Sequence, residues 1–215
     1  MTTYLQMTND VLARLREDAV ATTTATAYSS LIAKFVNDAK RQVEDAWQWD
    51  WLSTTITVTT VAGTSTYTVA GSGRRHRDID VNDSTNNARL HNVPIRWIID
   101  QQQLSTVQNG QPSYYAWNGS DGTDSKVELY PTPDGVASIK FNMIVPQADL
   151  SADADVITVP SEPVVMLAYA RALAERGEDG GLASSEAYSL GKSILADYIA
   201  LEQQRTPDFE CFVAC

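Results

Sequence analysis

Two stretches in the first quarter of the chain have apolar residues at spacings of three and four, which is the pattern of amphipathic helices. The first covers residues 3–16 and the second residues 27–48, and the threonine-rich residues 17–26 between them predict a loop. The longer helix would extend for roughly 33 Å and would need partner helices to cover its apolar stripe. The apolar positions of that stripe are Tyr28, Leu31, Ile32, Phe35, Val36, Ala39, Val43, Ala46 and Trp47.

Alternation of apolar and polar residues replaces the helical period from Ser53 onward, and this alternation predicts β-strands. Residues 53–61 and 64–71 predict two strands that are joined tightly at Ala62 and Gly63. Several short strands separated by turn residues are typical of an antiparallel sandwich or barrel. The further predicted strands lie at residues 77–83, 89–99, 113–118, 126–131 and 138–146.

The helical period returns after residue 160 and predicts a third helix that stops at Gly177 and a fourth over residues 182–204. Neither pair of helices could cover its apolar stripe alone, so we expect the two pairs to pack together. The predicted fold class is therefore α+β. Its four parts are an N-terminal helix pair (1–52), an inserted antiparallel β sandwich or barrel (53–160), a C-terminal helix pair that completes a four-helix bundle (161–205) and an extended C-terminal docking arm (206–215).

The composition places the chain among ordinary folded proteins and argues against several partners. Of its 215 residues, 43% are hydrophobic and 20% are charged, and no stretch is long and apolar enough to suggest a membrane span. The first residues do not resemble a secretory signal, so we expect synthesis in the cytoplasm. Sixteen Lys and Arg residues against 27 Asp and Glu residues give a net charge of −11, which argues against sequence-specific DNA binding.

The sequence contains no recognisable catalytic or metal-binding motif. His76 and His91 are not at a metal-ligand spacing, and Cys211 and Cys215 both lie in the last five residues. Residues 118–125 resemble a calcium loop but lack its required glycine and glutamate, so they predict a hairpin turn. We therefore expect no catalytic residue, no metal and no cofactor.

Two other features of the sequence allow more than one interpretation. Arg74, Arg75 and Arg77 form the one concentrated basic patch, which either contacts phosphate or an acidic partner or is a solvated hairpin tip. An aromatic group resembles a carbohydrate platform, although such residues more often pack a sheet against a helix. Its members are Trp47, Trp49, Trp51, Tyr114, Tyr115 and Trp117.

The final ten residues combine a helix-breaking proline, Pro207, with the apolar residues Phe209, Phe212 and Val213. Terminal segments are normally polar, so an apolar one suggests a docking arm that orders on a partner. The other interpretation is that the segment folds back and fills a gap in its own helical bundle.

Four segments in this order resemble the head-to-tail adaptor proteins of short-tailed bacteriophages, the tail tubular protein A family. None of the four is catalytic, and the resemblance depends on their order and separation along nearly the whole chain. The segments are FVNDAKRQVEDAWQWDWL (35–52), PSYYAWNG (112–119), VELYPTPDG (127–135) and VITVPSEPVVMLAYARALAERGED (156–179).

The resemblance implies a structural protein of the virion, located in the tail below the portal vertex. Its partners would be the portal protein, the tail nozzle protein and further copies of itself in a ring, twelve where the ring matches the portal. DNA would pass through the ring without sequence-specific binding, and the docking arm would lie in grooves of the portal. The alternative function is a carbohydrate-binding module that uses Tyr114, Tyr115 and Trp117.

Overall fold

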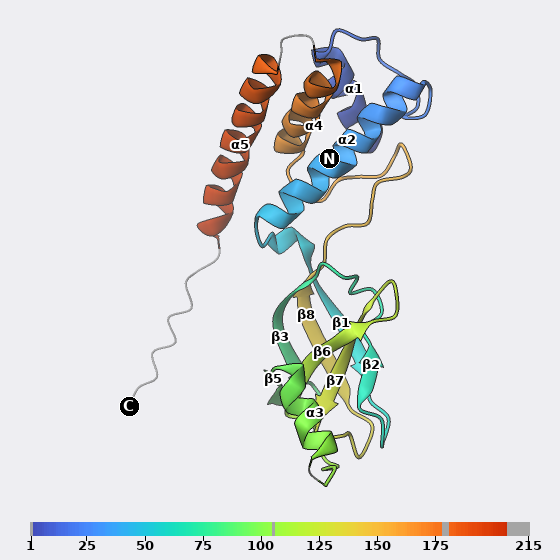
Figure 1. Cartoon of the computed structure of the whole chain (residues 1–215), viewed down its shortest axis with the longest axis vertical. Helices are drawn as coiled ribbons and strands as arrows, with labels where there is room; N and C mark the ends of the chain where they lie inside the picture. Colours follow the sequence, from blue (N-terminus) through green and yellow to red (C-terminus); the bar gives the residue numbers. More distant parts are fainter. Residues whose placement is uncertain (1, 105, 178–180, 206–215) are drawn as a thin grey trace. The chain divides into compact units, whose positions relative to one another are not determined.

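The structure, a computed structural model, describes residues 2–104, 106–177 and 181–205 and divides into two compact units (Figure 1). The helical unit comprises the chain up to Trp51 and from Gln147 onward, and the β unit comprises Leu52–Pro146. Five helices and two largely antiparallel sheets confirm the α+β class. None of the described helices is both long and apolar enough to span a membrane.

The helical unit contains α1 (Tyr4–Arg14), α2 (Ala27–Ala46), α4 (Ser161–Arg176) and α5 (Leu182–Gln203). Both N-terminal helices begin with a capping box, in which Thr3 pairs with Gln6 and Thr26 with Ser29. The α4 helix ends at Gly177, whose φ of 67° is the left-handed conformation that glycine adopts readily. The four helices expected from the apolar period are thus confirmed to within about two residues at each end.

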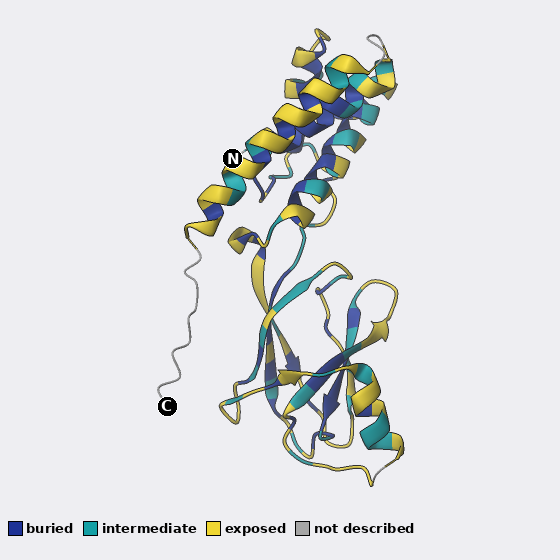
Figure 2. Cartoon of the chain, turned by 60° about the vertical axis from the view of Figure 1, so that its left-hand side comes forward, coloured by how far each residue is buried: buried dark blue, intermediate teal, exposed yellow. Residues whose placement is uncertain are grey.

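Helix α4 is the centre of the helical unit, because it packs against α1, α2 and α5. Its buried residues surround the helix almost completely, whereas α5 packs mainly on α4 and buries few side chains (Figure 2). Helices that precede the β unit in the sequence therefore pack with helices that follow it. The more specific prediction of a four-helix bundle is not confirmed. The buried residues of α5 are Ala187, Gly191, Leu195 and Glu202.

The segment 147–160 belongs to the helical unit and not to the β unit, to which the sequence prediction had assigned it. The Asn37 amide exchanges two hydrogen bonds with the backbone of Leu150, and the Tyr4 backbone N–H donates to the Asp155 carbonyl. Thr3 and Val156 form an isolated antiparallel bridge. The boundary lies at Pro146 because the polar backbone groups beyond it pair with α1 and α2.

A buried ion pair joins this segment to α2. The Lys40 ammonium lies 2.9 Å from the Glu44 carboxylate, and both side chains are fully buried. It also donates to the carbonyls of Gln147 at 2.7 Å and Ala148 at 3.1 Å. All three hydrogens of the ammonium thus have acceptors, which is the condition under which a buried lysine is tolerated.

The β unit contains two four-stranded sheets. The first has the order β1 (Ser53–Thr59), β8 (Ser138–Ile144), β3 (Arg77–Asp83) and β4 (Ala88–Arg89), with Ser53 opposite Ile144. The second has the order β2 (Thr66–Thr68), β7 (Ser125–Tyr130), β6 (Tyr114–Ser120) and β5 (His91–Asn92). Only β5 and β6 are parallel among these strand pairs. Within the described residues the two sheets do not close into a barrel.

The predicted tight pairing of the first two strands is wrong, because β1 and β2 belong to different sheets. Residues between them bond to other parts of the β unit: the Gly63 N–H donates to the Pro133 carbonyl, and the Ser65 carbonyl accepts from the Leu129 N–H of the strand that follows the 118–125 turn. Both strands nevertheless direct apolar side chains into one core, which explains why their alternation looked alike. This core contains Val58, Val69, Val81, Leu90, Tyr115, Val127, Leu129, Ala137, Ile139, Phe141 and Met143.

Residues 95–99, predicted as part of a strand, belong instead to helix α3 (Ile95–Gln103). Pro94 precedes the helix with φ −58°, and the missing proline N–H is no loss at a helix start. Ile98 is fully buried and packs with Ala116 and Tyr130. The strand prediction failed because Ile95, Ile98 and Ile99 follow the helical spacing and not the alternation of a strand.

Glu128 on β7 links α3 to the second sheet. Its buried carboxylate accepts hydrogen bonds from Gln102 at 2.9 Å, from the hydroxyls of Ser65 and Thr66 at 2.6 and 2.7 Å, and from Asn118 at 3.2 Å. Burial alone would raise the pKa of Glu128, but these hydrogen bonds outweigh it and the pKa lies below its ordinary value. The carboxylate is therefore charged and structural.

Candidate functional site

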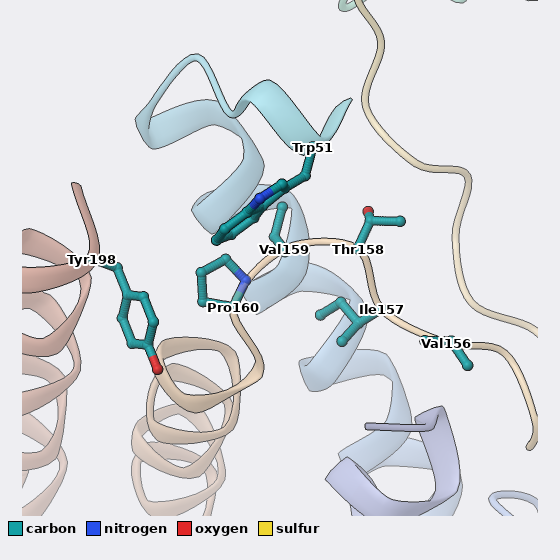
Figure 3. A pocket seen from close by; sticks show the side chains of 7 residues that line it. All are labelled: Trp51, Val156, Ile157, Thr158, Val159, Pro160 and Tyr198. Atoms are coloured by element: carbon teal, nitrogen blue, oxygen red, sulfur yellow. The ribbon is translucent and has the colours of Figure 1, made fainter. Parts of the chain in front are cut away.

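An apolar groove of about 510 Å³ opens on the helical unit, where the chain after α2, the segment before α4 and one side of α5 approach one another (Figure 3). A volume of this size falls in the range of sites that hold ligands or side chains of a partner. Its lining residues are Trp51, Val156, Ile157, Thr158, Val159, Pro160 and Tyr198.

Trp51 forms one wall of the groove and is held there by Trp49. Helix α2 ends at Ala46 because Trp47 is extended, and the buried Trp49 ring then turns back so that its Nε1–H donates to the Val43 carbonyl at 2.8 Å. Trp51 stacks on Trp49 with ring centroids 5.7 Å apart and an interplanar angle of 11°. Trp51 remains 45% exposed, so part of a large aromatic side chain is available to a partner.

The segment Val156–Pro160 forms the base of the groove, and the Gln147 side chain fixes its backbone. The Gln147 amide donates to the Val156 carbonyl at 2.8 Å and accepts from the Thr158 N–H at 3.2 Å. Ile157 and Val159 are buried, whereas Thr158 is exposed at the surface. Residues that sequence analysis had assigned to the β region thus become part of a helical-unit surface.

Helix α5 supplies the remaining wall through Tyr198, whose hydroxyl donates to the Glu162 carboxylate at 3.2 Å. Burial raises the pKa of Tyr198, and the hydrogen bond to Glu162 raises it further. The tyrosine therefore stays neutral over the physiological range.

The end of α5 lies beside the groove. The Arg205 guanidinium is 5.7 Å from the centre of the Trp51 ring and 3.4 Å from the buried Glu202 carboxylate. The same carboxylate accepts from the Asp50 N–H at 3.4 Å, and this contact ties the helix end to the tryptophan segment. The last described residue thus contacts the Trp51 wall of the groove through its side chain.

The chemistry of the groove suits binding and not a reaction. None of its lining residues is a carboxylate, histidine, cysteine or lysine, and only Trp51, Thr158 and Tyr198 carry polar side-chain atoms. Among the residues that the structure describes, no cluster of three metal-ligating side chains occurs. The groove is therefore suited to apolar or aromatic side chains.

Gly191 sets the close approach of α5 to α4. A Cβ atom at this position would lie 3.0 Å from Leu167 Cδ2, 3.2 Å from its Cγ and 3.4 Å from its backbone nitrogen. Substitution by a β-branched residue must therefore push the two helices apart.

We expect Gly191→Val to lower the free energy of unfolding of the helical unit by about 1–3 kcal/mol, the usual cost of overpacking a core. Urea denaturation followed by circular dichroism measures the change. Ser189→Val, at an exposed position of the same helix, is the matched control. Equal losses in the two variants would show that valine in the helix, and not the contact with Leu167, causes the change.

A second exposed apolar surface lies along α5. Its large side chains are Leu182 (67% exposed), Leu190 (52%) and Leu201 (58%), which lie within about 100° of one another around the helix axis. Apolar residues concentrated on one helix of a small unit suggest an interface with another protein.

The basic loop predicted from the sequence lies at the start of β3. Arg74 and Arg75 are exposed and Arg77 is half-buried. The Arg74 guanidinium donates to the Gly122 carbonyl in the turn between β6 and β7, and the Asp124 carboxylate accepts from the Gly73 N–H at 3.0 Å. The hairpin turn predicted for residues 118–125 is confirmed, since β6 and β7 pair across it.

The aromatic residues of the β unit pack inside it and do not form a platform. Tyr115 is buried in the core, and burial raises its pKa to about 12. Trp117 packs on the same core and on the His76 ring at 4.3 Å, and its Nε1–H donates to Asp78. Tyr114 packs with Trp97 of α3 at 5.0 Å. These contacts favour a packing role, and nothing among the described residues supports carbohydrate binding.

The predicted docking arm, with Pro207, Phe209, Phe212 and Val213, lies outside the described residues. Sequence reasoning missed the groove, although the spacing of Trp47, Trp49 and Trp51 had marked the end of α2. The signal for a groove would have been Pro160 and the apolar residues before it, which sequence analysis had placed at the end of the β module.

The family model described as SU10 adaptor protein matches residues 2–209 of the chain. No curated protein matches the sequence. The matched range includes every described helix and strand of both units. The narrower resemblance to tail tubular protein A stays a prediction.

Proposed function

Because the chain belongs to the SU10 adaptor protein family, we propose that it is a head-to-tail adaptor that forms a ring on the portal vertex of a phage. The family is one of structural phage proteins, so the chain is a component of the virion with a structural role. The observation that carries the proposal is the match over residues 2–209, which spans both units.

The exposed surface of α5 supports ring formation. Leu182, Leu190 and Leu201 are each more than half exposed on a helix that packs mainly on α4. In the proposed ring, which contains twelve copies where it matches the portal, these residues contact the neighbouring subunit. Such contacts are too few to hold two copies together alone, and the portal brings several copies into position at once.

The charge of the chain supports a channel that DNA passes through. A net charge of −11 repels the DNA backbone, so the genome would slide along the ring without sequence-specific binding. Arg74, Arg75 and Arg77 supply a local positive patch that contacts either DNA phosphate or an acidic neighbour. The β unit would be the platform for the tail nozzle protein.

The docking arm supplies the portal contact in this proposal. Mass photometry compares the chain alone, purified portal rings of the same phage and a mixture of the two. We expect the mass of the portal ring to increase in the mixture by a defined amount, which gives the number of bound copies. Deletion of residues 206–215 should abolish binding, because Phe209 and Phe212 are the aromatic residues expected to be buried at the interface. Each change, Phe209→Ala or Phe212→Ala, should weaken binding by about 2 kcal/mol.

Asp208→Ala in the same arm is the control and should leave the affinity within about threefold of the unaltered chain, as a polar residue at the rim of an interface does. Circular dichroism verifies that each variant keeps its helices. If the deletion variant binds the portal with unchanged affinity, the docking-arm proposal is wrong. If the full chain does not bind the portal, the adaptor proposal itself is wrong.

A further inference from the structure

We propose that the apolar groove of the helical unit binds residues 206–215 of the same chain, with Phe209 and Phe212 against Trp51, Ile157 and Tyr198. This contact is separate from the proposed docking on the portal, since it is made by the chain in the absence of any partner. The groove and the portal would then compete for the same residues.

The first argument is where the described chain stops. The Arg205 guanidinium lies over the Trp51 ring, 5.7 Å from its centre, so the last described residue is within one arginine side chain's length of the groove wall. An extended chain advances about 3.3 Å per residue. Phe209 can therefore reach roughly 13 Å and Phe212 roughly 23 Å from Arg205, which is enough to lie along a groove that begins at Trp51.

The second argument is the match of chemistry. The groove offers a partly exposed indole, three aliphatic residues, a proline and a tyrosine, and no charged residue lines it. Phe209 and Phe212 are three residues apart, a spacing that places both rings on one side of a polyproline-II chain with three residues per turn. Asp208 and Glu210 would then face away from the groove, toward water.

The third argument selects the same chain over a second copy. A segment attached by a short connection has an effective concentration in the millimolar range at a nearby site. Free subunits at micromolar concentration cannot compete with that value. The groove is therefore filled by its own chain until a partner offers the two phenylalanines a better site.

A disulfide test measures this contact directly. Thr158 is exposed and lines the groove, so Thr158→Cys adds a thiol with little disturbance of the core. In a Cys215→Ser background the natural partner thiol is Cys211, which lies between the two phenylalanines. We expect the 158–211 disulfide to form within one chain under a glutathione redox buffer, detected by mass spectrometry of the denatured, unreduced protein.

Ser193→Cys in the same background is the matched control, because Ser193 is exposed on α5 and is not a lining residue of the groove. It lies about 18 Å along the helix from Arg205, and the six residues from Arg205 to Cys211 can span about 20 Å. Its disulfide should form at least tenfold more slowly. Adding Phe209→Ser and Phe212→Ser to the Thr158→Cys variant should reduce its rate to that of the control. Equal rates at positions 158 and 193, or a rate unaffected by the two serines, would overturn the proposal. Disulfides between chains would overturn its same-chain assignment.

A portal measurement separates this proposal from the proposed function. Thr158→Asp places a carboxylate in the groove, where the apolar side chains of the arm would remove it from water, and should therefore release the arm. If the groove holds the arm nine-tenths of the time, the apparent affinity for the portal should rise about tenfold. An unchanged affinity in a chain that does bind the portal would contradict the competition. A chain that never binds the portal would contradict the adaptor role and leave the disulfide result as the decisive test of the groove.

Discussion

Replacing Lys40 by methionine is expected to lower the free energy of unfolding of the helical unit by about 3–5 kcal/mol. The variant fills a similar volume but removes the positive charge beside the buried Glu44 carboxylate. It also removes the donor to the carbonyls of Gln147 and Ala148, which hold the segment before α4 on α2. Chemical denaturation monitored by circular dichroism measures the loss.

Lys34→Met is the matched control, since Lys34 is exposed on the same helix and its replacement should change the free energy of unfolding by less than about 0.5 kcal/mol. The double variant Lys40→Met with Glu44→Leu should recover part of the stability, because it no longer buries a carboxylate without its cation. A single Lys40→Met variant as stable as the unaltered protein would show that the ion pair contributes nothing.

Trp49→Ala is expected to cost about 3–5 kcal/mol of unfolding free energy, the usual cost of truncating a large buried aromatic side chain. Trp49 is fully buried, donates to the Val43 carbonyl and supports Trp51 by stacking. Its loss should therefore also make the Trp51 wall of the groove less ordered. Quenching of tryptophan fluorescence by acrylamide, which increases as Trp51 becomes more accessible, measures this second effect.

Trp49→Phe distinguishes packing from hydrogen bonding. It keeps an aromatic ring beside Trp51 but removes the Nε1–H, so the Val43 carbonyl loses its donor at a cost of about 1–3 kcal/mol. The order of stability should be the unaltered protein, then phenylalanine, then alanine. A phenylalanine variant as unstable as the alanine variant would assign the whole effect to the hydrogen bond.

The helices of the helical unit were predictable because each has a local signal for its period and its ends. Thr26 caps α2 and Gly177 ends α4, and both signals depend on neighbouring residues alone. The helix α3 was missed because it is only nine residues long and follows a proline in a strand-rich region. Its position depends on distant contacts, such as Gln102 with Glu128, that the local pattern does not contain.

The strands were recognised, but not their pairing. The strands β1 and β2 are close in sequence but lie in different sheets. Each pairs with a strand more than 55 residues away, β1 with β8 and β2 with β7. The groove was unpredictable for the same reason, since Trp51, Ile157 and Tyr198 come from three distant parts of the chain. The residues of the basic loop and the docking arm could be selected from composition, and their roles stay predictions.

The pairing of β1 with β8 brings the two connections between the units together. Ser53 and Ile144 are direct partners, so the points where the chain leaves the helical unit and returns to it are about 5 Å apart. A unit inserted through two adjacent points needs only to keep its first and last strands paired. Its other strands and loops can change without altering the two points where it joins the helical unit. We therefore expect insertions or replacements inside the β unit to leave the packing of the helical unit unchanged.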